Sequence, residues 1–111
     1  MTFFHEISHA IDMCLGGGVY RSGVDPRFRR KFDGARSFVT PYAAAGIDEW
    51  WAESARSWWG DIANDSRSLW PAVSRERLRG IDEEAYELVR SIFEEEIPRM
   101  AAEIRAREVA A

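Results

Sequence analysis

The chain has 111 residues, of which 46% are hydrophobic and 31% charged, and 15 Lys and Arg against 19 Asp and Glu give a net charge of −4. This length fits one small domain, and the charge balance argues against a polybasic nucleic-acid binder. An aromatic content of 13%, with five Trp, argues against a disordered chain. The sequence has no apolar run of about 18 residues, so we expect no membrane span.

Helical spacing and capping residues define the elements of the first half. Apolar positions predict a helix over Thr2–Leu15 that ends at Gly16–Gly18. Asp25 is a good N-cap for a short helix over Pro26–Asp33. The β-branched residues and Pro41 in Ala35–Ala45 favour an extended or irregular stretch.

The second half is also predicted to be helical. A helix begins near Ile47 and runs through Trp58, and a connector over Asp61–Ala72 is held to the core by Leu69 and Trp70. A helical turn or two over 74–79 precedes the longest helix, which begins after an Asp N-cap at position 82. A proline at position 98 should kink or break that helix before a last helix over 100–107. The expected fold class is therefore mainly α.

The first predicted helix contains the motif His-Glu-x-x-His. His5 and His9 lie one helical turn apart, so both imidazoles can reach one metal ion. Glu6 is about 100° from His5 around the helix, where a carboxylate can take a proton from a metal-bound water. The chain has two histidines, and both belong to this motif. A chance pair of polar residues on an amphipathic helix is the alternative.

A catalytic zinc needs a third protein ligand, and the sequence indicates which amino-acid types can supply it. The single Cys14 offers no thiolate cluster, and its position opposite His5 on the helix predicts a small buried hydrophobic side chain. The third ligand is thus expected to be Asp or Glu. Glu49 and Glu53 lie i and i+4 on one face of the second strong helix, so one can bind metal while the other orients an imidazole. The alternative is that Glu49 and Glu53 are both solvated carboxylates on the surface of the helix.

Two segments of the chain resemble a known family. They are His5-Glu6-Ile7-Ser8-His9-Ala10-Ile11-Asp12 and Tyr42-Ala43-Ala44-Ala45-Gly46-Ile47-Asp48-Glu49-Trp50-Trp51-Ala52-Glu53-Ser54. The resemblance is to zinc metallopeptidases of the anthrax lethal factor type, which are gluzincins and include small bacterial and phage toxin peptidases. Ser8 stands where the family has glycine, and Trp50-Trp51 where it has Phe-Phe.

The resemblance implies roles for individual residues. It implies that Zn²⁺ is bound by His5, His9 and Glu49, with Glu6 as general base. It also implies that Tyr42 donates a hydrogen bond to the oxyanion of a tetrahedral intermediate. By the same resemblance, Glu53 supports a metal ligand without binding the metal, and Asp12 has a supporting or structural role. The implied activity is metalloendopeptidase hydrolysis of a peptide or protein substrate.

The family fold is a zincin-like core, with a His-Glu-x-x-His helix, a glutamate-ligand helix and a long C-terminal helix. In gluzincins a β-sheet precedes the first of these helices and aligns the substrate. Four residues precede His5 here, so we expect one metallopeptidase-like domain over 1–111 without that sheet. A fragment, a misassigned start and a degenerate remnant remain open. As given, the chain is expected to be cytoplasmic, or secreted or delivered if it is part of a longer toxin or phage protein.

Other features are assigned to structure rather than to binding. The basic cluster Arg27, Arg29, Arg30 and Lys31 is read as a solvated helix face, and the tryptophans as core or exposed apolar surface. No nucleic-acid or membrane partner is expected, and the oligomeric state is left open. Two alternatives to the peptidase stay open: a catalytically incompetent remnant that binds zinc structurally or acts as a helical interaction module, and a helical domain without metal.

Overall fold

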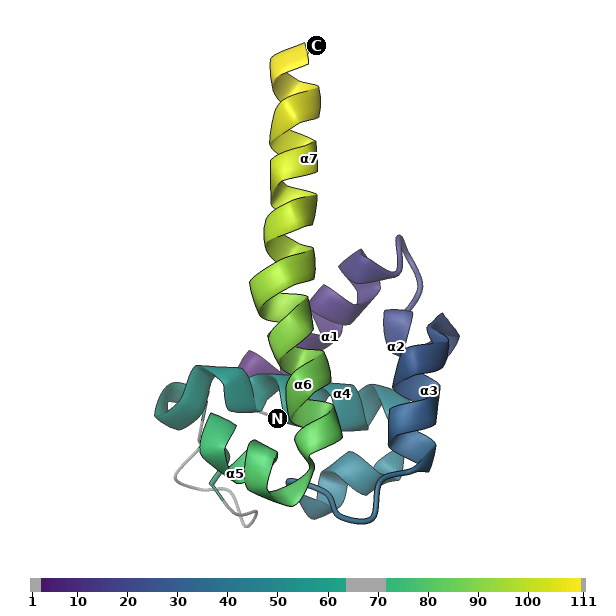
Figure 1. The fold of residues 1–111 in the computed structure, drawn as a ribbon, viewed down its shortest axis with the longest axis vertical. Helices are drawn as coiled ribbons and strands as arrows, with labels where there is room; N and C mark the ends of the chain where they lie inside the picture. Colours follow the sequence, from purple (N-terminus) through teal and green to yellow (C-terminus); the bar gives the residue numbers. More distant parts are fainter. Residues whose placement is uncertain (1–2, 64–71, 111) are drawn as a thin grey trace.

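The computed structural model describes residues 3–63 and 72–110, and these residues form helices and loops with no strand among them. The expected mainly α fold is confirmed. In chain order the elements are α1 (Phe3–Leu15), α2 (Arg21–Val24), α3 (Pro26–Asp33), the 3-10 helix η1 (Pro41–Ala45), α4 (Ile47–Arg56), the 3-10 helix η2 (Ser57–Ala63), α5 (Arg75–Ile81), α6 (Glu83–Ser91), the π-helical turn η3 (Ile92–Glu96) and α7 (Ile97–Ala110) (Figure 1).

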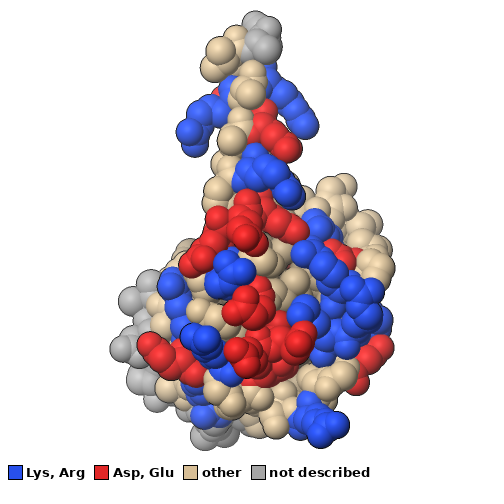
Figure 2. Space-filling view, viewed as in Figure 1, with Lys and Arg blue, Asp and Glu red and all other residues tan. Residues whose placement is uncertain are grey.

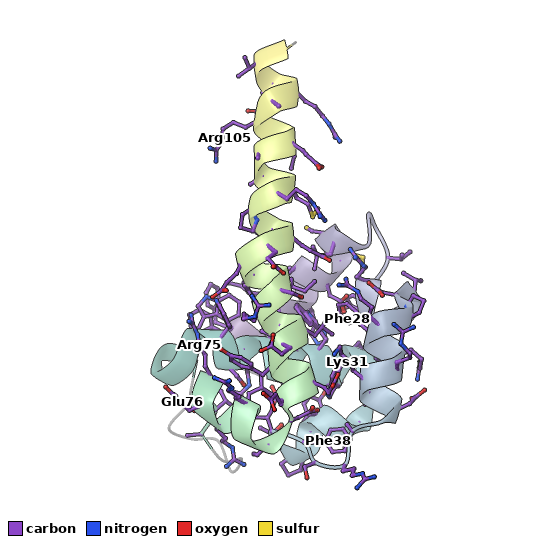
Figure 3. The ribbon with its side chains drawn as sticks, viewed as in Figure 1. Phe28, Lys31, Phe38, Arg75, Glu76 and Arg105 are labelled. Atoms are coloured by element: carbon purple, nitrogen blue, oxygen red, sulfur yellow. The ribbon has the colours of Figure 1, made fainter. Side chains whose placement is uncertain are left out.

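Helix α4 lies at the centre of the fold. It packs against α1, α2, α3, α6 and η1, and every residue from 50 to 57 is buried. Trp50 and Trp51 are 2% and 0% exposed, which makes them core residues as expected. Phe28 packs its ring against Trp51 and points inward from α3 (Figure 3). A helix that is surrounded in this way holds its side chains in fixed positions.

Helices α1 and α4 meet at Ser8, which lies between His5 and His9 on α1. Ser8 is fully buried, and its Oγ donates a hydrogen bond to the carbonyl oxygen of Phe4 at 2.7 Å. The carbonyl of Ser8 in turn accepts a hydrogen bond from Trp51 Nε1 at 2.8 Å. The Ser8 hydroxyl therefore has its hydrogen-bond partner within its own helix. The hydrogen bond from Trp51 fixes the position of α4 along α1.

A three-glycine turn reverses the chain after α1, as the sequence predicts. Gly17 and Gly18 have φ values of 66° and 110°, which favour glycine. A Cβ on Gly16 would lie 1.7 Å from the carbonyl oxygen of Val19. The returning segment is held by Asp12, which accepts hydrogen bonds from the Ser22 backbone N–H at 2.7 Å and the Ser22 hydroxyl at 2.5 Å. The turn and this clamp fix residues 16–22 against α1.

Helix α3 begins at its predicted cap. The Asp25 side chain accepts a hydrogen bond from the backbone N–H of Arg27, and Gly34 ends the helix. The basic face of α3 lies beside the acidic face of α6 (Figure 2), and Lys31 pairs with Glu84 at 2.5 Å across that boundary. Part of the basic cluster is thus used in ion pairs within the protein rather than left fully solvated.

Pro98 does not break the C-terminal helix, contrary to the sequence expectation. Helices α6, η3 and α7 form one continuous rod whose upper part stands clear of the body (Figure 1). The reason is the π turn, in which the Ile97 N–H donates to the carbonyl of Ile92. Pro98 then occupies the second position of α7, where the first turn of a helix tolerates a proline. The turn also carries Phe93, which stacks on Trp58 with ring centroids 5.5 Å apart.

Three other expectations need correction. Cys14 is exposed rather than buried, because its side of α1 faces an apolar groove shared with α7. Helix α4 ends at Arg56 and continues as a 3-10 helix that Gly60 interrupts with φ 65°. The 35–45 stretch, expected to be extended or irregular, is irregular up to Thr40 and then forms η1. The expected anchors Leu69 and Trp70 lie outside the described residues.

No helix in the described part of the chain is long and apolar enough to cross a membrane.

Candidate metal centre

Two packed helices bring three of the predicted metal ligands together. Helix α1 supplies His5 and His9, and α4 supplies Glu49. His9 Nε2 lies 3.1 Å from His5 Nε2 and 2.6 Å from Glu49 Oε1, and His5 Nε2 lies 3.7 Å from the same oxygen. His5 is buried and the other two are half-buried. The three donor atoms therefore converge on one small space.

The size and the chemistry of this space suit a zinc ion. Ligands about 2.0 to 2.1 Å from a tetrahedral Zn²⁺ are roughly 3.3 Å apart. The three separations observed here, 2.6, 3.1 and 3.7 Å, bracket that value. Two imidazole nitrogens and one carboxylate oxygen are a common donor set for catalytic zinc, with the fourth position open. The residues present thus fit the metal with small side-chain adjustments.

The first histidine is oriented by a buried carboxylate network. His5 Nδ1 donates a hydrogen bond to Glu53 Oε2 at 2.8 Å, which places the lone pair of the ring on Nε2, the atom that lies 3.1 Å from His9 Nε2 and 3.7 Å from Glu49 Oε1. Glu53 also accepts hydrogen bonds from Thr40 Oγ1 at 2.7 Å and from Arg56 Nε at 2.6 Å. Burial by itself raises the pKa of Glu53, but hydrogen bonds from these three residues outweigh it and lower the pKa to about 2. Glu53 is therefore ionised and acts only as an acceptor.

The second histidine has no such partner. Among the described residues, His9 Nδ1 is buried without a hydrogen-bond partner. Its ring packs instead against Tyr20, with centroids 5.5 Å apart and planes tilted by 39°. Desolvation, together with the carboxylates of nearby acidic residues, raises the pKa of Tyr20, so its hydroxyl keeps its proton at neutral pH. The acidic residues are Asp48, Asp12, Glu49 and Glu6.

Tyr42 lies on the other side of the centre. The 3-10 helix η1 places its ring 5.7 Å from the ring of His5, at a tilt of 34°. The hydrogen bond that its hydroxyl donates to Glu49 is the main reason that the pKa of Tyr42 rises to about 12. Tyr42 is thus a protonated donor held beside one of the candidate ligands.

The two remaining predicted residues lie outside this cluster of contacts. Glu6 follows His5 on α1, and its side chain is exposed. Asp12 is fully buried, and both of its oxygens accept hydrogen bonds from Ser22. Burial raises the pKa of Asp12 in spite of these hydrogen bonds. Asp12 therefore fixes the chain after the glycine turn, and it interacts with the candidate ligand His9 only through their charges.

Three residues of the site were not found from the sequence. Arg56 lies three residues after Glu53 on the same helix, so its spacing was a usable signal. Thr40 and Tyr20 come from irregular segments, and nothing in their sequence spacing relates them to the motif helix. Only the folded chain shows that they contact Glu53 and His9.

Comparisons with protein-family models, with curated protein sequences and with solved structures give no match to this chain. The function is therefore inferred from the residues of the site.

Proposed function

We propose that this chain is a zinc-dependent metalloendopeptidase of the gluzincin type, acting on a peptide or protein substrate. The observation that supports it most directly is the convergence of His5 Nε2, His9 Nε2 and Glu49 Oε1, which lie within 4.8 Å of one another. These are the residues for which the resemblance to lethal-factor-type peptidases implies metal ligation. The sequence motif and the spatial cluster are two separate reasons to assign the same three side chains.

In this proposal His5, His9 and Glu49 hold the ion, and Glu53 orients His5. Bound there, Zn²⁺ would lower the pKa of a water molecule and polarise a substrate carbonyl. Within α1, Glu6 is adjacent to His5 and exposed, so its carboxylate is accessible to water and substrate. Glu6 would remove a proton from the attacking water and pass it to the leaving amine.

Tyr42 has the position and protonation state of an oxyanion donor. Its hydroxyl donates to Glu49, and its raised pKa keeps the proton on the phenol. With Glu49 engaged as a metal ligand, that hydroxyl would be available to the substrate carbonyl oxygen as negative charge develops there. A single donor of this kind contributes on the order of a hundredfold to the rate.

The first test is the zinc content of the purified chain at neutral pH by elemental analysis. We expect about one zinc per wild-type chain and much less in Glu49→Ala. Glu94→Ala is the matched control, because Glu94 is an exposed glutamate on η3 and should leave the zinc content unchanged. A folded wild-type chain without zinc would overturn the proposal.

The second test separates a peptidase from a zinc-binding chain without catalysis, which was the alternative from the sequence. Glu6→Gln should keep the zinc and lose the hydrolysis of a fluorescently labelled casein, because the amide cannot accept the proton from water. If Glu6→Gln is as active as the wild type, the proposed mechanism is wrong. If the wild type binds zinc and cleaves no casein or peptide, the alternative is favoured.

A further inference from the structure

The segment after α1 returns to the metal centre and brings a second phenol to it. Tyr20 lies against His9 in nearly the same way as Tyr42 lies against His5, at 5.5 and 5.7 Å between ring centroids and at tilts of 39° and 34°. The two imidazoles themselves meet edge to face, with centroids 4.7 Å apart. Each candidate histidine ligand therefore has a tyrosine beside it, and the two tyrosines come from different segments.

The backbone is built to hold Tyr20 there. The glycine turn needs Gly16 because a Cβ would meet the carbonyl of Val19, and it needs positive φ at the next two residues. Beyond Tyr20 the chain is fixed again, because Asp12 binds both the backbone N–H and the hydroxyl of Ser22 inside the protein. Tyr20 thus lies between two constrained points, four residues after the start of the turn and two before the clamp.

The Tyr20 side chain has no hydrogen-bond partner among the residues that the structure describes, and it is half-buried, so it contacts both the site and solvent. Its neighbour Val19 is 53% exposed and points away into water. A tyrosine in this position offers a hydroxyl donor and an apolar ring to a molecule bound next to His9. With Tyr42 beside His5, a tyrosine ring lies next to each of the two candidate histidine ligands.

We infer that Tyr20 is a substrate-contacting residue that forms the His9 side of the binding site and donates a hydrogen bond to the peptide backbone bound there. This inference rests on the proposed peptidase function and narrows its substrate to a chain that carries a backbone acceptor beyond the group at the metal. A small molecule that reaches only the metal would not depend on Tyr20.

The test uses the Co²⁺-loaded chain, because visible absorption reports the binding of a hydroxamate without any turnover. Two probes are compared: acetohydroxamate, which reaches only the metal, and a dipeptide hydroxamate, which extends beyond it. The variants are Tyr20→Phe, which removes the hydroxyl, and Tyr20→Ala, which removes the ring. Val19→Ala is the control on the same segment.

We expect Tyr20→Phe to bind Co²⁺ and acetohydroxamate as the wild type does and to bind the dipeptide hydroxamate about tenfold more weakly, the loss of one hydrogen bond. Tyr20→Ala should lose more, and Val19→Ala should lose nothing. The same order is expected for kcat/KM with labelled casein.

Two results would overturn the role of Tyr20 and leave the proposed function unaffected. One is unchanged binding of the dipeptide hydroxamate by Tyr20→Phe, and the other is equally weakened binding of both hydroxamates. Loss of Co²⁺ by Tyr20→Phe would also overturn it, because the residue would then support the metal rather than the substrate. A folded wild-type chain that binds no Co²⁺ would overturn the proposed function as well, so the two failures are distinguishable.

Discussion

The side chains of His5 and Glu53 are joined by a buried hydrogen bond of 2.8 Å between Nδ1 and Oε2, although 48 residues separate them in sequence. This bond sets the orientation of one imidazole before any metal arrives. His9, by contrast, has no hydrogen-bond partner for Nδ1 among the described residues. The two candidate ligands therefore differ in how firmly they are held, and this asymmetry can be measured.

Replacing the orienting carboxylate should weaken the metal centre. We expect Glu53→Gln to lower the affinity for Zn²⁺ about 10- to 100-fold, because the amide is a weaker acceptor for His5 Nδ1 and carries no charge. Competition with a chromophoric chelator measures the affinity. Glu94→Gln serves as the control, and equal affinity in Glu53→Gln and Glu94→Gln would show that the buried hydrogen bond does not act on the metal.

Acid should destabilise the metal-free chain through the same carboxylate. The pKa of Glu53 is lowered from 4.5 to about 2 in the folded chain, so its contribution to stability is fully present above about pH 4.5. That contribution is lost as the pH falls from 4.5 toward 2. Asp25, with its pKa lowered to about 2 by hydrogen bonds that outweigh its burial, adds to the loss in the same range.

Urea unfolding at a series of pH values, with a chelator present, measures this effect. The free energy of unfolding should fall less steeply between pH 5 and pH 3 in Glu53→Gln than in the wild type. The Glu94→Gln control should follow the wild type. Parallel curves for Glu53→Gln and the wild type would contradict the assigned pKa.

The clamp that holds the chain after α1 should contribute to stability. Asp12→Ala leaves the buried Ser22 N–H and hydroxyl without their acceptor, which we expect to cost about 2 kcal/mol in the free energy of unfolding. The control is Asp33→Ala, since the Asp33 side chain is 60% exposed and forms only a surface ion pair. A cost in Asp12→Ala no larger than in Asp33→Ala would argue against the clamp.

The glycine turn offers a steric test. Gly16→Ala places a methyl group on the Val19 carbonyl and should force the turn to rearrange. Gly17→Ala meets no atom within 4 Å but retains a φ of 66°, so we expect about 1 kcal/mol of destabilisation. Gly23→Ala, in α2 with open space around it, is the matched control. Thermal unfolding should rank them Gly16→Ala, Gly17→Ala, Gly23→Ala, from most to least destabilised.

The contact between the two ligand helices depends on one indole. Trp51→Phe keeps most of the packing and removes the hydrogen bond that joins α4 to the Ser8 carbonyl of α1. The expected cost is about 1 kcal/mol, the loss of one buried hydrogen bond. Zinc affinity should fall as well, because Ser8 lies between the two histidines on α1. Wild-type values for both quantities would show that this bond does not set the register of the helices.

Local signals predicted much of this fold. Asp25 and Asp82 were identified as N-caps, and both accept the expected backbone hydrogen bonds. The start of α4 near Ile47 and the end of α1 before the glycine turn also agree with the structure. Capping and glycine stops are decided by a few neighbouring residues, so they can be read without knowledge of the tertiary fold.

The errors came from interactions between distant segments or from a rarer helix type. The sequence predicts that Pro98 kinks or breaks the helix if the hydrogen bonds before it are α-helical, whereas a π turn supplies a different pattern there. Cys14 was placed in the core by helical phase alone, but α7 does not close over that face of α1. The i, i+4 pair of glutamates could be proposed from spacing, yet only packing decides that Glu49 faces both imidazoles and Glu53 lies behind His5.

Helix α4 both forms the centre of the core and carries a candidate metal ligand. The residues from 50 to 57 are buried on every side, and Glu49, at the edge of this stretch, is a candidate ligand that remains 15% exposed. A scan of all single substitutions along α4 should therefore reduce the yield of folded protein at nearly every position. Glu49 is where soluble, folded variants with a lost function should be recovered. Natural variation in this helix would accordingly be constrained by folding before it is constrained by chemistry.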